Sequence, residues 1–389
     1  MEQVNIIGVG MTRFGVLEDS VLQLAETTAM EAISDSNTHD LKFDYLFVGT
    51  HNPDEFASRS HLSTLLADQL GIIPAGAARI ESGPSSGSSA FETGVAFVAS
   101  GMADLVMVVG VEKMSLVERG TAVKIINRML SQESESRYGA TPAALAALVT
   151  RRYMHEYGLT RDELSLVPVK AHRNGVQNPL AHFQMEISVE EVNRSKIVSD
   201  PLTLYDCCPT SDGAAAVILA SNRLVKECGL KDQAIRILGI GHGTDYLALQ
   251  HRTSLTSMNA TKVAAERAFK MAQLTPANVD IYEIHDAFSI LELITMEDLG
   301  LAERGGAVSL VKEGITDVTG DVPINTTGGL KARGHPTGAT GIAQIRDIVL
   351  QMRGAAPKGL QIEDPTIGLT HNIGGFGNNM VVTLLEKNT

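Results

Sequence analysis

The chain has 389 residues, of which 44% are hydrophobic and 20% charged, so it can bury a sizeable core and is not a disordered sequence. Its 32 Lys and Arg residues against 45 Asp and Glu residues give a net charge of −13, which argues against non-specific binding to nucleic acid or to an anionic membrane. Three cysteines, Cys207, Cys208 and Cys228, form neither a disulfide framework nor a zinc motif, and no apolar run reaches the roughly 18 residues of a membrane span. We therefore expect a cytoplasmic protein with reduced thiols and no metal site.

The order of predicted elements in the first half of the chain returns in the second half. Each copy begins as an apolar strand, a helix and a second apolar strand, and continues through a Gly-rich turn, a helix start and a late strand. These segments are 4–10, 22–34, 43–49, 83–90 and 105–111 in the first copy, and 235–241, 261–273, 279–284, 334–341 and 380–385 in the second. Continuous apolar strands are typical of a sheet that is buried on both faces. The sequence therefore predicts a duplicated α/β fold.

The pattern is interrupted by an insertion at about residues 115–204. Helical segments are predicted at 142–157 and 161–171, followed by a loop at 172–179. Long insertions in compact folds usually carry a binding surface.

A strand at 214–220 closes the first copy, and residues 221–232 are interpreted as a linker. The prediction is therefore two units, residues 1–225, which include the insertion, and residues 232–389.

Two histidines stand where α/β folds place catalytic groups. His285 follows an apolar strand, and the end of a central strand is the usual ligand site of such folds. His335 lies in the Gly-rich turn 334–341. A neutral imidazole can donate to an oxyanion or shuttle a proton near neutral pH, and two such positions favour chemistry over a purely structural role.

Two further turns could bind an oxyanion. Residues 81–87 carry serines and glycines just before the predicted helix 88–99, where backbone N–H groups are free to bind an anion. Residues 371–377 contain Asn372, Gly374, Gly375 and Gly377, whose backbone N–H groups could form a second oxyanion site.

The joint order of several motifs resembles the thiolase superfamily, in particular the branch of archaeal acetoacetyl-CoA thiolases and sterol-carrier-protein-type thiolases. The matching stretches are residues 109–115, Asn178-Pro179, 211–216, 285–288, 334–341 and 371–375. The resemblance covers nearly the whole chain. It implies a five-layered αβαβα fold of two βαβαβαββ-like halves, usually a homodimer, with coenzyme A thioesters as substrates and no covalently bound cofactor. It also implies that His335 and His285 bind a thioester oxygen and that the loop 374–377 supplies donors for the other carbonyl.

One departure from the family pattern is large. The family's Cys-x-Ser-Gly turn is replaced by Pro84-Ser85-Ser86-Gly87, so Pro84 stands at the position of the nucleophilic cysteine. Ala287 stands where sterol-carrier-type members have an acid/base cysteine. Proline cannot form an acyl-enzyme, and Ser85 is the alternative nucleophile, although a serine needs a base within reach.

Three functions remain open at this point. The first is an acyl-CoA C-acyltransferase of the thiolase type, which carries out Claisen or retro-Claisen chemistry. The second is a retro-aldol lyase acting on a β-hydroxyacyl-CoA, as in thiolase relatives that lack the cysteine. The third is a non-catalytic acyl-CoA-binding subunit.

Two binding partners are also predicted. The phosphates of coenzyme A are expected on a local basic patch formed by Lys124, Arg128, Lys170, Arg173, Lys331 and Arg333. The resemblance further implies a small partner subunit with an OB-fold and a zinc ribbon.

Overall fold

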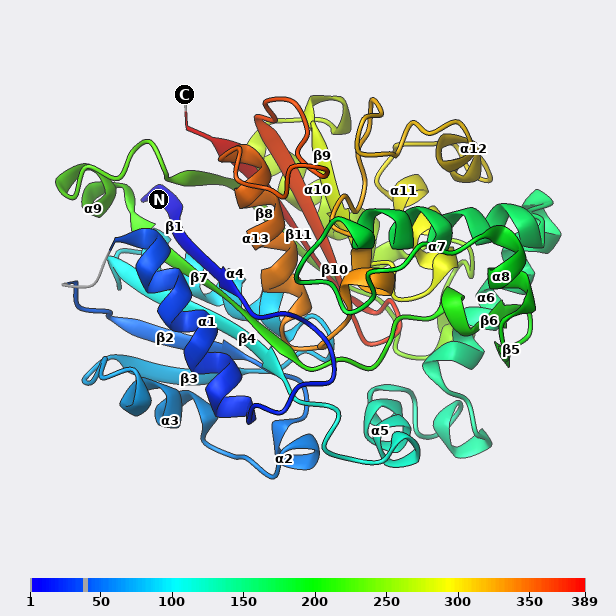
Figure 1. Ribbon diagram of the computed structural model, residues 1–389, viewed down its shortest axis with the longest axis horizontal. Coiled ribbons are helices and arrows are strands. Elements are labelled where there is room, and N and C mark those ends of the chain that lie inside the picture. The colour runs from blue at the N-terminus through cyan, green and yellow to red at the C-terminus, as the bar shows by residue number, and fades with distance from the viewer. Residues whose placement is uncertain (1, 38–40, 389) are drawn as a thin grey trace.

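A computed structural model describes residues 2–37 and 41–388 and places a nine-stranded mixed sheet at the centre of the molecule (Figure 1). The strand order is β3-β2-β4-β7-β1-β8-β11-β10-β9. The strands are β1 (Val4–Met11), β2 (Tyr45–Gly49), β3 (Gly76–Ile80), β4 (Leu105–Glu112), β7 (Gly213–Ser221), β8 (Ile235–Thr244), β9 (Ile281–Ile284), β10 (Ile367–Gly374) and β11 (Asn379–Lys387). Strands β5 (Ile197–Ser199) and β6 (Leu202–Thr203) form a separate pair.

Helices cover both faces of the sheet and form most of the insertion. They are α1 (Val21–Ser36), α2 (Pro53–Phe56), α3 (Leu62–Gln69), α4 (Ser86–Ala99), α5 (Arg119–Ile126), α6 (Pro142–Tyr157), α7 (Arg161–Val176), α8 (Val189–Arg194), α9 (Asn222–Glu227), α10 (Asn259–Ala272), α11 (Ser289–Asp298), α12 (Ala307–Lys312) and α13 (Thr340–Met352). A wide turn, η6 (Gly329–Arg333), precedes α13. Figure 1 shows α5 to α8 at one end of the molecule, away from the two chain termini.

The two halves repeat one topology. In the first half the order β2-β4-β7-β1 has one parallel pair, β2 with β4, and two antiparallel pairs. In the second half β9-β10-β11-β8 repeats that order with the same directions. The counterpart of β3 is reduced to a single bridge between Tyr282 and Ile324. The predicted duplication is therefore confirmed.

The halves meet along a short seam and enclose a central helical layer. Strands β1 and β8 pair only at Asn5–Arg236 and Ile6–Ile235. Helices α4 and α13 pack against each other, α4 on strands of the first half and α13 on strands of both halves, whereas α1 covers the outside of the first half and α10 that of the second. This arrangement is the predicted five-layered αβαβα fold.

Glycines in β1 and β8 let the outer helices lie directly on the strands. A Cβ atom added to Gly10 would collide with the carbonyl oxygen of Thr28 in α1, and one added to Gly241 would collide with that of Ala264 in α10. The repeated Gly-x-Gly motif of the two halves thus has a packing role.

Two predicted loops were wrong. Helix α7 continues to Val176, so the predicted loop 172–179 begins inside it; its Gly175 packs against Ala332, where no larger residue fits. The predicted linker 221–232 contains α9, which Ser221 caps by accepting a hydrogen bond from the Leu224 N–H. Tertiary packing and a local cap outweighed the turn-forming residues.

Within residues 2–37 and 41–388, no helix combines the length and apolar character needed to cross a membrane. The same residues contain no group of three or more His, Cys, Asp or Glu side chains placed to hold a metal ion. We propose that the units 1–225 and 232–389, with an insertion at about 115–204, correspond to the two repeated halves.

Candidate active site

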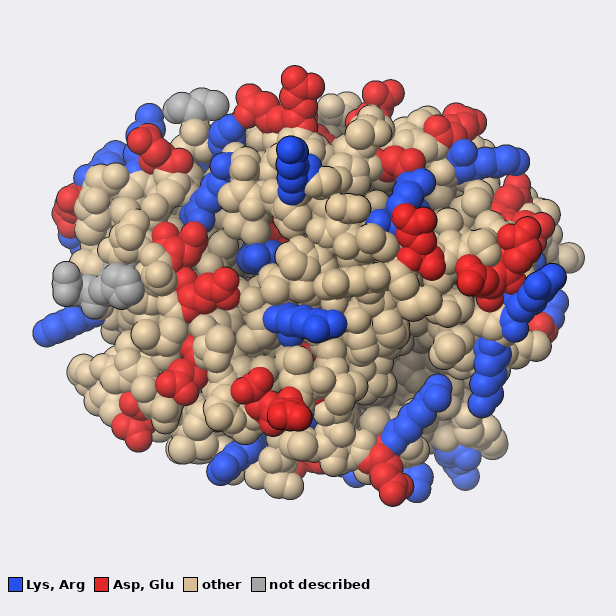
Figure 2. Space-filling model, in the orientation of Figure 1, with Lys and Arg blue, Asp and Glu red and all other residues tan. Residues whose placement is uncertain are grey.

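A cavity of about 750 Å³ lies where the starts of α4 and α13 meet the insertion. Pro84, His285, His335 and Gly375 all line it, although they come from four separate segments. Residues of α5 form part of its wall, and Figure 2 shows a hollow in the surface beside this part of the molecule, with Lys and Arg side chains near its margin. The structure therefore brings the two predicted histidines and the residue at the predicted nucleophile position into one chamber.

His285 follows β9, is 2% exposed, and is held in one tautomer. The side-chain amide of Asn372 donates to its Nδ1 at 3.0 Å, and the Ile373 N–H donates to the same atom at 3.3 Å. The Ser88 hydroxyl donates to Asn372 Oδ1, which fixes the orientation of the amide. Since Nδ1 accepts, the ring proton is on Nε2. Burial, with a smaller contribution from His335, holds the pKa of His285 well below its usual value, so the ring is neutral.

His335 has the opposite tautomer. The Thr340 hydroxyl donates to the Pro336 carbonyl at 3.0 Å, so its oxygen accepts from His335 Nδ1 at 2.7 Å. The backbone N–H of His335 donates to Ser211 Oγ, which anchors the turn. Nε2 of His335 is therefore an unprotonated acceptor. Burial lowers the pKa of His335 to about 3, so this ring is also neutral near pH 7.

The two imidazoles offer one hydrogen-bond donor and one acceptor to a molecule bound in the cavity. Their ring centres are 4.9 Å apart and the rings are nearly perpendicular, at 86°. His285 offers an Nε2–H that can stabilise a developing negative charge, and His335 offers a lone pair that can take a proton. Both histidines predicted from the sequence thus line one cavity, and their catalytic role stays a prediction; the sequence alone could not distinguish their tautomers.

The start of α4 contains no nucleophile that faces the cavity. Ser85 is fully buried, donates its hydroxyl proton to the Ser82 carbonyl at 2.8 Å, and is absent from the cavity wall. No imidazole is within hydrogen-bond distance of its hydroxyl in the part of the chain that the structure describes. The geometry therefore disfavours Ser85 as a nucleophile, and Pro84 occupies the wall instead.

The last Gly-rich turn contributes unequally to the site. Gly375 lines the cavity with φ of 60°, a conformation that favours glycine. Gly374 packs against Ser85, so it joins the turn to the start of α4. Gly377 lies next to Arg252 and Met258 and does not line the cavity. Of the predicted donors, only Gly375 is thus placed at the cavity.

Three members of the predicted basic patch are buried, so the patch was wrong in part. Lys170 pairs with Glu292 at 2.6 Å, Arg333 pairs with Asp347, and Lys331 is 1% exposed. Lys124 and Arg128 are exposed near α5, and Arg128 pairs with Glu55. Arg119, which the sequence did not single out, lines the cavity.

Two cysteines reach the cavity that the sequence did not assign to it. Cys207 and Cys208 both line the wall, and the Cys208 N–H donates to the Ala287 carbonyl at 2.8 Å. Burial raises the pKa of each thiol to about 12, so both stay protonated and are weak nucleophiles. No local motif marks them, because a tertiary contact, the antiparallel bridge between Cys207 and Phe288, brings their segment to this position.

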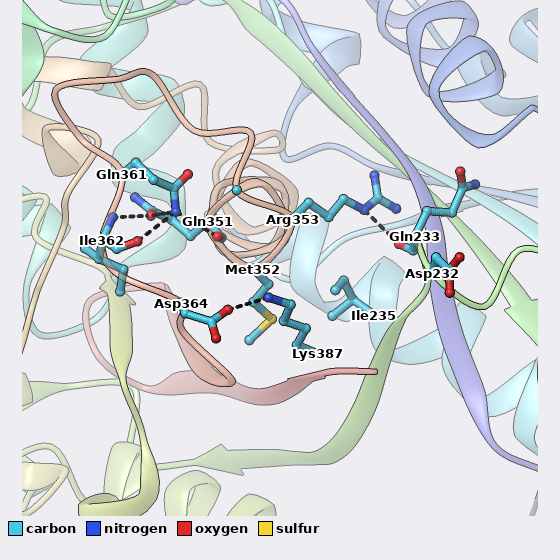
Figure 3. A pocket seen from close by; sticks show the side chains of 11 residues that line it. Asp232, Gln233, Ile235, Gln351, Met352, Arg353, Gln361, Ile362, Asp364 and Lys387 are labelled. Carbon is cyan, nitrogen blue, oxygen red and sulfur yellow. Dashed lines mark hydrogen bonds and ion pairs between the residues drawn. The ribbon is translucent and has the colours of Figure 1, made fainter. Parts of the chain in front are cut away.

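A second cavity of about 510 Å³ lies at the seam between α13 and β8. Figure 3 shows interactions among several of its residues: Lys387 pairs with Asp364 at 2.5 Å, and Arg353 Nε donates to the backbone carbonyl of Gln233 at 2.8 Å. None of the predicted site residues lines it. It is therefore not part of the predicted site.

The chain belongs to the thiolase family. Residues 4–223 match the family model "Thiolase, N-terminal domain", and residues 241–387 match "Thiolase C-terminal domain-like". An acetyl-CoA acetyltransferase from Methanothermobacter thermautotrophicus is 42% identical over 100% of both chains. Sterol carrier protein 2 from Bos taurus is 34% identical over 99% of this chain and 72% of its own. A solved structure titled "Ltp2-ChsH2(DUF35) aldolase" has a TM-score of 0.85 and 26% identity, covering 99% of this chain and 98% of that chain.

Proposed function

We propose that this protein makes or breaks a carbon–carbon bond in an acyl-CoA thioester through an enolate, without an acyl-enzyme. The reaction that fits the site best is retro-aldol cleavage of a β-hydroxyacyl-CoA. The observation that carries this proposal is the pair of neutral imidazoles with opposite tautomers in one cavity. A retro-aldol reaction needs one base and one oxyanion donor, and the pair supplies one of each.

The proposed steps use only these residues and the substrate. His335 Nε2 takes the proton of the β-hydroxyl group, the new C=O bond forms, and the Cα–Cβ bond breaks. The electron pair of that bond passes to the thioester as an enolate, whose oxygen accepts a hydrogen bond from His285 Nε2–H. The protonated His335 then returns its proton to Cα, which gives an aldehyde or ketone and a shortened acyl-CoA. A single oxyanion donor of this kind is worth about 3 kcal/mol.

Burial keeps the His335 ring unprotonated in the resting enzyme, so its Nε2 lone pair is available to accept a proton. The low pKa makes this imidazole a weak base, so we infer that it takes the proton as the negative charge of the enolate develops beside it and then returns the proton readily. Closing the cavity around the substrate would exclude water and strengthen both hydrogen bonds.

The absence of a competent nucleophile supports a non-covalent route. Pro84 is on the cavity wall at the start of α4, Ser85 faces away, and the two nearby thiols remain protonated. An acyl-enzyme would need an activated thiolate or hydroxyl at this helix start.

A second candidate is direct Claisen-type acyl transfer between two CoA thioesters. Its specific support is the relative named acetyl-CoA acetyltransferase, which is similar over the full chain. This reaction would pass through the same enolate and use the same two histidines. Its cleavage substrate would be a β-ketoacyl-CoA in place of a β-hydroxyacyl-CoA. It lacks an observed group to hold the acyl fragment.

We also propose the assembly and location of the protein. The edge strand β3 leaves backbone hydrogen-bonding groups unpaired on one side, which suits pairing with a second copy in a homodimer. The related Ltp2-ChsH2(DUF35) aldolase structure includes a DUF35 component, which supports a partner subunit for this chain as well, and we propose for it the small OB-fold and zinc-ribbon architecture that the resemblance implies. A cytoplasmic location is consistent with three free cysteines.

An assay of paired substrates tests the proposal. The purified protein is tested alone and with any co-purifying subunit. It is incubated with a β-hydroxyacyl-CoA or with the matching β-ketoacyl-CoA, each in the presence and absence of free CoA, and the products are separated by chromatography. Cleavage of the β-hydroxy substrate without free CoA supports the lyase, and CoA-dependent cleavage of the β-keto substrate supports the acyltransferase. Tight binding of both without turnover would leave the third function, a non-catalytic acyl-CoA-binding subunit.

A further inference from the structure

The cavity wall contains a buried ammonium group that the proposed reaction does not use. Lys331, in the wide turn η6, is 1% exposed and lines the cavity. Its Nζ donates to two backbone carbonyls, those of Asp206 and Asp286, each at 2.9 Å. An ammonium has three N–H donors, so one has no acceptor among residues 2–37 and 41–388.

Neither carboxylate near Lys331 bonds its ammonium group directly, although Asp286 interacts with it at longer range. Asp206 pairs with Arg161 at 2.7 Å and accepts from Ser289 at 2.8 Å. Asp286 Oδ1 accepts from the Leu330 N–H at 2.7 Å, while Oδ2 is buried without a partner. Neither carboxylate is within 4.0 Å of the Lys331 ammonium, whereas the buried Lys113 and Lys170 each have a carboxylate within hydrogen-bond distance. A buried cation without a direct counter-ion is costly, and its neighbours only partly offset that cost.

The wall near Lys331 offers a second unused polar group. The Tyr205 hydroxyl makes no hydrogen bond to another described residue, and its ring packs edge-on against His172 at 5.5 Å. Aromatic and aliphatic side chains form the surrounding wall, including Phe183, Leu204 and Leu291. In such surroundings a charge-assisted hydrogen bond is stronger than at the surface.

We propose that Lys331 recognises an anionic carboxylate on the acyl chain of the substrate, so that the protein acts on ω-carboxyacyl-CoA thioesters in preference to plain fatty acyl-CoA. The inference rests on the proposed function, because it assumes that the cavity holds an acyl-CoA. The free N–H of Lys331 would donate to the carboxylate, and the substrate would supply the counter-ion that the protein lacks. The Tyr205 hydroxyl belongs to the wall of the same cavity and would donate a second hydrogen bond.

Calorimetric binding of matched thioesters to the wild-type protein tests the inference. The pairs are succinyl-CoA with butyryl-CoA and glutaryl-CoA with pentanoyl-CoA, whose members differ only in the terminal carboxylate. We expect the carboxylated member of at least one pair to bind about tenfold tighter, the usual effect of one hydrogen bond to a charged group. Equal affinities in both pairs would overturn this inference and leave the proposed function intact. Absence of binding by all four thioesters would overturn the proposed function and this inference together.

Variants assign the preference to the residue. Lys331→Met should abolish the preference for the carboxylated member, and Tyr205→Phe should reduce it. Lys262→Met, which removes an exposed lysine of α10 outside the cavity, is the matched control and should retain it. Thermal unfolding shows whether the Lys331→Met protein is folded. If it is not, the affinities of the wild-type and Tyr205→Phe proteins for the matched thioester pairs decide whether the carboxylate preference exists and arises at this wall. A folded Lys331→Met protein with an unchanged preference would contradict the assignment.

Discussion

The starts of α4 and α13 occupy equivalent places in the two halves, yet they differ in chemistry. They pack against each other so closely that a Cβ atom added to Gly87 or Gly341 would collide with the opposite segment. At the start of α13, His335 and Thr340 form a hydrogen-bonded pair beside the cavity. At the start of α4, the serine side chains bond to one another and to nearby carbonyls, and only Pro84 reaches the cavity wall.

The difference indicates that the two halves have separate tasks. The second half provides both imidazoles, since His285 follows β9 and His335 precedes α13. The start of α4 in the first half provides the uncharged Pro84 to the wall and Ser88, which orients Asn372. Duplication thus supplied two similar helix starts, and only the second brings a titratable side chain to the cavity wall. Substitutions that add a reactive group to the first helix start, or remove the imidazole or its supporting groups from the second half, test this difference.

The largest expected effect is a gain of covalent chemistry at the first helix start. Pro84→Cys places a thiol on the cavity wall, where the free Nε2 of His335 can take its proton and the α4 N-terminus favours the thiolate. Incubation with acetyl-CoA should add one acetyl group, detected by intact mass and located by peptide mapping. Ser85→Cys is the matched control and should remain unmodified, because Ser85 does not line the cavity. Equal labelling of the two variants would show that the helix start is not positioned as described.

Removal of the proposed base should have the next largest effect. His335→Ala should lower turnover by on the order of 10²-fold or more, because it removes the proton acceptor. The free energy of unfolding should change little by comparison. His155→Ala, an exposed histidine of α6, is the control and should retain full turnover. Unchanged turnover in His335→Ala would remove this residue from the mechanism.

Asn372 is a positioning residue, and its loss should have a smaller effect. Asn372→Leu keeps the side-chain volume but removes the amide that donates to His285 Nδ1, so the Nε2–H tautomer is no longer enforced. We expect kcat to fall by about tenfold with KM nearly unchanged, since the donor acts mainly on the transition state. Steady-state kinetics give both constants. An effect on KM alone would mean that Asn372 shapes the cavity without orienting His285.

The smallest effect on activity is expected from pH. The pKa of His335 is lowered to about 3 and that of His285 lies well below its usual value, both through burial, so turnover should not change as pH passes through 6.5. Stability behaves differently, because these histidines take up protons in the unfolded chain but not in the folded one. The contribution of these two histidines to the free energy of unfolding is therefore fully present above pH 6.5. It is lost as pH falls towards the pKa of the folded state, by at most about 1.4 kcal/mol per pH unit for each histidine. Urea unfolding at several pH values measures this loss, and a bell-shaped rate profile centred near pH 6.5 would contradict the assigned neutral state.

The sequence predicted the layers of the fold well, because they follow from local patterns. The apolar strands and the Gly-rich turns repeat in order, and strand pairing then places His285 and His335 at one edge. The partners of the buried ions could not be predicted in the same way. Arg333 pairs with Asp347, and Lys170 pairs with Glu292, which lies more than a hundred residues away. Both cations look like surface charges until the packing of α7 and η6 is known.

The cavity wall was also only partly predictable. Cys207 and Cys208 reach it because their segment lies antiparallel to the segment that contains Ala287. No local sequence pattern predicts this contact. The tautomers of the two histidines likewise depend on Thr340 and Asn372, whose roles follow from hydrogen-bond geometry and not from residue type.

Intact-mass spectrometry during turnover tests the central claim most directly. The wild-type protein is mixed with a β-hydroxyacyl-CoA that it cleaves, quenched in acid at times shorter than one turnover, and weighed whole, while the released aldehyde or ketone is measured in the same samples. A non-covalent enolate mechanism predicts that the product accumulates while the mass of the protein stays unchanged at every time. An acylated protein that appears before the product and then decays, with the acyl group on Ser85, Cys207 or Cys208, would contradict it.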